Sequence, residues 1–168
     1  MLQRIIAPLW GLAGVFFLLG YAVFRLAPRA KVALESDLSL WHWVVLGLWT
    51  VFMLIGEGYR GFQKKFSPRT AARVRYLRDH PHPIRTLLAP LFCMGYFHAT
   101  RKTRIVSICL TLGIVLLVVL VSLAPQPWRG IIDFGVVLGL AWGIISLLIF
   151  TVQALTRKDY PHSPETPA

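Results

Sequence analysis

The sequence predicts an all-α, polytopic membrane protein with four transmembrane helices, and three observations indicate this fold class. The 168 residues are 56% hydrophobic, with a mean hydropathy of +0.62, whereas soluble domains are typically about 45–50% apolar. Charged residues make up only 15% of the chain and are clustered. Four apolar stretches have the length of roughly 20 residues that a helix needs to cross a bilayer core. We therefore expect a single four-helix membrane domain over residues 1–168.

The predicted spans cover residues 5–26, 40–61, 105–124 and 131–155. Pro28 and the PQPWRG segment at 125–130 are expected to end the first and third spans. The first apolar run is too long for the hydrophobic region of a signal peptide and lacks a small-residue cleavage pattern, so we expect a permanent span. The absence of asparagine and the excess of arginine over lysine, 13 to 5, favour a prokaryotic source.

The distribution of Lys and Arg predicts the orientation, because short cytoplasmic loops hold the excess of these residues. The connection between the second and third spans holds eleven, against three and one in the other two connections. We therefore expect a multi-pass protein of the inner membrane, with both termini and the long loop in the cytoplasm.

The long loop, about residues 62–104, is expected to be structured. Ser67 and Pro68 are typical of a helix start, as N-cap and first helical residue, and TAARVRYLRD at 70–79 continues as a short basic surface helix. Residues 84–97 are apolar, too short to span, and divided by Pro90, which predicts an interfacial or re-entrant segment.

Glu57 is the most unusual residue, because it is a carboxylate inside the second predicted span. Such residues usually face the protein interior or a cavity and mark functional sites. Arg60 follows at i+3, where it could form an ion pair with Glu57 that clamps the helix end. The alternative is that Glu57 binds a proton, a cation or a substrate amine.

Residue type and spacing also predict lipid-contacting and helix-packing residues. Lys64, Lys65, Arg69, Arg73, Arg75 and Arg78 lie beside an apolar segment and are expected to contact anionic lipid headgroups. Gly135, Gly139 and Gly143 form a smooth stripe for close helix packing, inside the chain or in a homodimer. His80, His82 and His98 match no zinc spacing, so neither a metal nor a cofactor is predicted.

These features predict a non-enzymatic accessory or assembly protein. Its basic loop would bind anionic headgroups and a membrane-protein partner or a second copy, and nucleic acid is not expected because the cations lie at membrane interfaces. One alternative is a small oligomeric transporter that uses Glu57. Another is an enzyme acting on a phosphorylated lipid, in which Arg60, Arg85 and Arg101 would hold phosphate and His98 or Glu57 would move protons.

Overall fold

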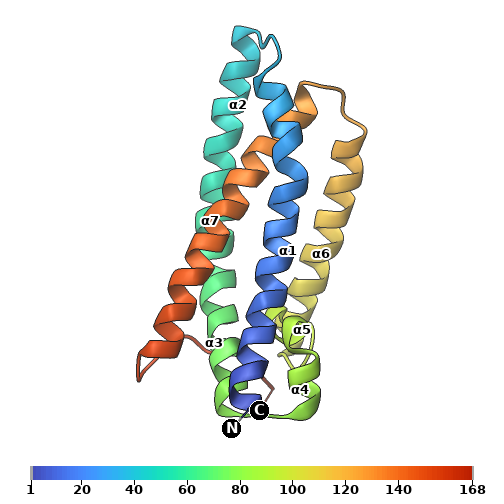
Figure 1. Cartoon of the computed structure of the whole chain (residues 1–168). Coiled ribbons are helices and arrows are strands. Elements are labelled where there is room, and N and C mark those ends of the chain that lie inside the picture. The colour runs from blue at the N-terminus through green and yellow to red at the C-terminus, as the bar shows by residue number, and fades with distance from the viewer. Residues whose placement is uncertain (1, 168) are drawn as a thin grey trace.

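The computed structural model describes residues 2–167, and within them the secondary structure is entirely helical. Four helices are long and apolar enough to cross a membrane: α1 (Gln3–Leu34), the continuous helix Leu40–Asp79, α6 (Arg101–Ser122) and α7 (Trp128–Thr156). This architecture confirms the predicted fold class and supports a multi-pass membrane protein. The start of α1 and the described C-terminal residues lie at the end of the bundle that also holds α3, α4 and α5 (Figure 1), which we call the basal end.

α1 is longer than the predicted first span, and the expected break at Pro28 is wrong. Both Pro8 and Pro28 lie inside the helix, which continues to Leu34. Each proline removes one backbone hydrogen bond, but proline is tolerated in membrane helices where neighbouring groups satisfy the backbone. At about 1.5 Å per residue the helix exceeds a bilayer core of roughly 30 Å, so its end extends beyond the apolar layer.

The second span also continues beyond its predicted end near residue 61. α2 (Leu40–Met53), a π-helical segment η1 (Leu54–Phe66) and α3 (Ser67–Asp79) form one helix of 40 residues. The predicted N-cap at Ser67 is wrong, because this residue has helical dihedral angles (φ −63°, ψ −46°) and is buried. The helix therefore leads from the apolar layer directly into the basal end.

The Pro-broken segment forms two short helices, α4 (Pro83–Leu87) and α5 (Ala89–Met94). α5 packs closely on α1: a Cβ added at Gly11 would lie 2.7 Å from Cys93 Sγ, and one at Gly14 would lie 2.5 Å from Pro90. Glycine on α1 is thus what allows the segment to approach.

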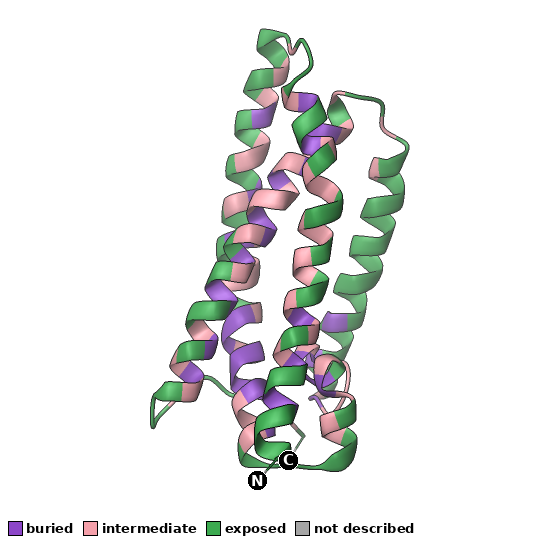
Figure 2. Cartoon of the chain, in the orientation of Figure 1, coloured by how far each residue is buried: buried purple, intermediate pink, exposed green. Residues whose placement is uncertain are grey.

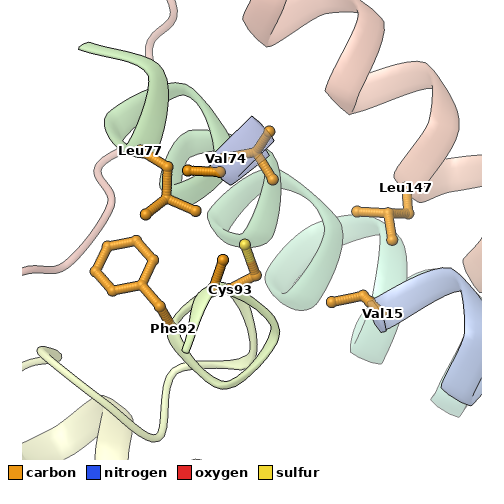
Figure 3. Packing of buried hydrophobic residues seen from close by; sticks show 8 residues of the cluster. Val15, Val74, Leu77, Phe92, Cys93 and Leu147 are labelled. Atoms are coloured by element: carbon orange, nitrogen blue, oxygen red, sulfur yellow. The ribbon is translucent and has the colours of Figure 1, made fainter. Parts of the chain in front are cut away.

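The hydrophobic core lies at the basal end, where α1, α3, α5 and α7 meet. Figure 3 shows Val15, Val74, Phe92, Cys93 and Leu147 packed together there. By contrast, α6 stands apart from the other spans and is exposed along almost its whole apolar length (Figure 2). The bundle is therefore a packed unit of α1, the Leu40–Asp79 helix and α7, with α6 attached mainly at its base.

Candidate functional site

Arg73 on α3 is the polar centre of the basal end. Its exposed fraction is 0%, and its guanidinium lies 4.1 Å from the centroid of the Phe92 ring. All three guanidinium nitrogens donate to backbone carbonyls, at 2.5 Å from Phe92, 2.6 Å from Pro164, 2.8 Å from Phe97 and 2.9 Å from His98. Burial lowers the pKa of Arg73 to about 10, which still leaves it charged at neutral pH.

The prediction that Arg73 contacts lipid headgroups is therefore wrong. A helical pattern of arginines among small apolar residues is typical of a surface helix, but here other segments of the chain cover α3. Ala71, Val74 and Leu77 are buried as well. Arg73 has no surface to present to a headgroup and instead joins α3 to the α5 region and the C-terminal tail.

Arg75 and Arg78 bind the end of α7. Arg75 donates to the carbonyls of Ala154, Arg157 and Lys158, and Arg78 donates to that of Leu155 at 3.0 Å. The last carbonyls of a helix have no intrahelical partner and carry partial negative charge, so cations are favoured there. Both arginines also lie near Asp79, with nitrogen–oxygen distances of 3.6 and 3.0 Å.

Arg69 is half-buried and contacts the tail through Glu165, with Nη1 3.7 Å from Oε2. Glu165 also accepts a hydrogen bond from the Thr103 hydroxyl, and its backbone carbonyl accepts one from the Thr100 amide at 2.9 Å. One glutamate of the tail thus bonds to α3 and to the start of α6. Four of the six predicted headgroup cations, Arg69, Arg73, Arg75 and Arg78, are engaged within the chain.

The remaining two predicted headgroup residues, Lys64 and Lys65, are exposed. Lys64 lies over the Tyr59 ring, 4.6 Å from its centroid. Arg60 in η1 is exposed too, and so are Arg101, Lys102 and Arg104 at the start of α6. These six exposed cations, Arg60, Lys64, Lys65, Arg101, Lys102 and Arg104, are called the basal cations below.

A second polar group gathers around Tyr76. Arg85 lies 5.4 Å from the Tyr76 ring centroid, and the His98 ring lies 6.4 Å from it. Desolvation and the nearby Arg85, Arg73 and His82 lower the pKa of His98. Of the residues predicted to act on a phosphorylated lipid, Arg85, a phosphate-holding candidate, and His98, a proton-transfer candidate, share this cluster. No described contact joins Arg60, Arg101 or Glu57 to it.

Glu57 lies in η1, where its side chain faces α7. A Cβ added at Gly139 would be 3.0 Å from Glu57 Oε2, and this buried oxygen has no hydrogen-bond partner within the described residues. None of the ion pairs found over residues 2–167 includes Glu57, and Arg60 is exposed. The predicted Glu57–Arg60 clamp is therefore wrong, because the side chain turns toward the α7 backbone.

The glycine stripe of α7 is what admits Glu57 and its neighbours. Added Cβ atoms at Gly135 and Gly143 would lie 2.6 Å from Trp49 and from Phe62, respectively. The stripe therefore faces α2 and η1 of the same chain. Of the two predicted roles, packing inside the chain and packing in a homodimer, the structure has the first.

Sequence reasoning missed the C-terminal tail, residues 157–167. Glu165, Thr100 and Thr103 gave no motif, since they lie far apart in the sequence and become neighbours only when α3, α6 and the tail meet. Asp133 in α7 was not singled out by its sequence context either, and it is buried with Oδ2 unpaired among the described residues. No group of three or more His, Cys, Asp or Glu side chains within residues 2–167 is placed to hold a metal ion.

Comparisons with protein-family models, with curated proteins and with solved structures gave no match. The site must therefore be interpreted from its own geometry.

Proposed function

We propose that the protein is a non-enzymatic accessory or assembly protein of the prokaryotic inner membrane, with its basal end and both termini in the cytoplasm. The basal cations would bind anionic lipid headgroups. The observation that supports this proposal is the division among the cations of the long loop, since the arginines of α3 are used inside the fold and the basal cations remain exposed. A Lys or Arg at an anionic surface contributes about 1 kcal/mol of attraction.

The position of the basal cations fits this role. Lys64 and Lys65 follow the second apolar span, and Arg101, Lys102 and Arg104 precede the third. Cations on two separate spanning helices at the same end of the bundle would meet the headgroup layer together.

We further propose that the protein binds a partner inside the membrane, because α6 is exposed. Its apolar residues, among them Leu112, Leu116 and Leu120, are exposed rather than packed on the other spans. Membrane helices associate by van der Waals packing, so α6 has a free surface for a helix of another protein or of a second copy.

The test compares two double variants in lipid of mixed charge. The first variant, Lys64→Gln with Lys65→Gln, removes two basal cations. The second, Arg25→Gln with Lys31→Gln, removes two exposed cations from the C-terminal half of α1, which lies away from the basal end. The first variant should retain less anionic lipid than the wild type on mild-detergent purification, measured by native mass spectrometry. Binding should weaken with salt, and the difference between this variant and the wild type should shrink, because salt screens the attraction of the removed cations. Equal retention in the two variants would refute headgroup binding at the basal end. Proteins that copurify with the wild type would identify the partner.

Glu57 supports a second candidate function, a small transporter that carries protons. Its Oε2 atom, beside Gly139, is a polar atom inside a span with no hydrogen-bond partner among residues 2–167, and such groups are typical of transport sites. The reconstituted protein should then conduct protons in dye-loaded liposomes, and Glu57→Gln should not, while the exposed Glu35→Gln control should. Absence of flux in the wild type would eliminate this candidate.

A further inference from the structure

The C-terminal tail is held to the basal end through polar contacts. Its residues, RKDYPHSPETP at 157–167, include no Ala, Val, Leu, Ile, Met or Phe, so the tail has little of the apolar side-chain surface whose burial normally fixes a segment in place. Tyr160 donates from its hydroxyl to the Pro68 carbonyl at 3.0 Å, the His162 ring lies 5.7 Å from that of Phe150 on α7, and Pro164 and Glu165 form the next polar anchor toward the C-terminus.

Between the tail and α3 lies an open cavity of about 450 Å³. It is lined by residues of α3, including Arg75 and Tyr76, and by tail residues from Lys158 to Pro164. The tail is therefore not packed flush on α3. It crosses the basal end beside this cavity and is held by Tyr160, by His162 and by the Pro164–Glu165 anchor.

The Pro164–Glu165 anchor has the features of a peptide-binding site. Arg73, which is wholly buried, donates to the Pro164 carbonyl, and Arg69 and Thr103 meet the Glu165 carboxylate. The Thr100 amide donates to the Glu165 backbone carbonyl. The anchor thus has four donors: two guanidinium groups, one hydroxyl and one backbone amide. They contact the backbone carbonyls of two successive residues and the carboxylate of the second. Hydrogen bonds to charged groups are stronger than those between neutral groups.

We propose that Arg69, Arg73, Thr100 and Thr103 form a receptor site for a peptide with a glutamate after a proline, and that Pro164–Glu165 is its intramolecular ligand. The bound tail joins α3 to the start of α6, which Ser107 and Thr111 also hold to Met94 and Tyr96. Release of the tail would remove one of these attachments of α6 and leave the receptor site open to a peptide of the same chemistry. This proposal does not depend on the lipid-binding function above.

A peptide-competition experiment tests the receptor site. A fluorescent peptide with the sequence of residues 158–167 is titrated with the full-length protein in detergent, and its anisotropy is measured. A tethered ligand competes at an effective concentration near the millimolar range. The Glu165→Ala protein should therefore bind the peptide roughly tenfold more tightly than the wild type does.

Two controls test the chemistry of the site. The same peptide with alanine at the position of Glu165 should not bind, and adding Arg69→Gln to the Glu165→Ala protein should abolish binding. Equal binding by the wild type and the Glu165→Ala protein, or binding that is unaffected by Arg69→Gln, would overturn the proposal.

Hydrogen exchange provides a second measurement that needs no added peptide. Releasing Glu165 removes the acceptor of the Thr100 amide, so Glu165→Ala should raise the exchange rate at Thr100 by about tenfold, the loss of roughly 1–1.5 kcal/mol. Asp159→Asn is the matched control, since Asp159 is an exposed tail carboxylate that takes part in none of the ion pairs found over residues 2–167. Unchanged exchange at Thr100 in Glu165→Ala, or an equal rise in Asp159→Asn, would also overturn the proposal.

Discussion

At the residue scale, Arg73 shows how a buried charge can organise an irregular region. The segment after α5 and the C-terminal tail carry carbonyls that no helix satisfies, and an unpaired polar group in the interior costs about 1–3 kcal/mol. The guanidinium has five donors in a fixed planar arrangement, and four carbonyls from three parts of the chain accept from it.

Arg73→Gln should therefore lower the free energy of unfolding by about 3 kcal/mol or more, because several carbonyls lose their donor at once. Arg78→Gln is the control, since Arg78 is half-buried and its one bond to a backbone carbonyl is to Leu155. It should cost about 1 kcal/mol or less. Thermal unfolding in detergent measures both, and equal costs would show that Arg73 does not organise the basal end.

His98 predicts a pH dependence of stability. Its native pKa lies below the ordinary value of 6.5, because desolvation and the cations Arg85, Arg73 and His82 disfavour the charged form. The unfolded chain then binds more protons than the native one, so stability is complete above pH 6.5 and falls as the pH drops below that value.

His98→Asn should reduce this loss of stability below pH 6.5. Asparagine is chosen because residue 98 has a φ of 48°, a left-handed conformation that asparagine tolerates better than most residues. Unfolding temperatures measured between pH 5 and 8 check the prediction. Identical pH profiles for the wild type and the variant would contradict it.

At the scale of elements, close packing between α7 and α2–η1 depends on glycine. A Cβ at Gly135 would lie 2.6 Å from Trp49 Nε1, and the indole cannot move freely because it donates to the Ile132 carbonyl at 3.1 Å. The same substitution at Gly113 on α6 meets nothing within 4 Å.

Gly135→Ala should therefore destabilise the bundle by about 1–3 kcal/mol, the usual cost of overpacking. Gly113→Ala should be neutral or slightly stabilising, because alanine favours the helix by about 1 kcal/mol over glycine. Thermal unfolding of the two variants in one detergent compares them. A Gly135→Ala protein as stable as the wild type would mean that the helices can separate without cost.

At the scale of the whole molecule, the proposed orientation predicts which positions a membrane-impermeant thiol reagent reaches. In a background of Cys93→Ala and Cys109→Ala, single cysteines at Ser36 and Gln126 should be labelled from outside intact cells. A cysteine at Asp159 should be labelled only after lysis. Asp159 is exposed and therefore reports on the side of the membrane, whereas Thr70 is fully buried and would stay unlabelled on either side. Labelling of position 159 in intact cells would reverse the orientation.

The sequence by itself determined the four spans, since crossing a bilayer requires long apolar helices and leaves a signal in every residue along them. It also singled out Glu57 and the glycines of α7. Only the tertiary structure decided what these residues meet. The direction of the Glu57 side chain toward α7, rather than toward Arg60, depends on the neighbouring helix and not on local spacing. The roles of Arg73 and Glu165 were likewise invisible, because their partners are backbone carbonyls, hydroxyls and a cation from distant segments. A backbone carbonyl carries no residue identity, so no pattern of side chains could have predicted those contacts.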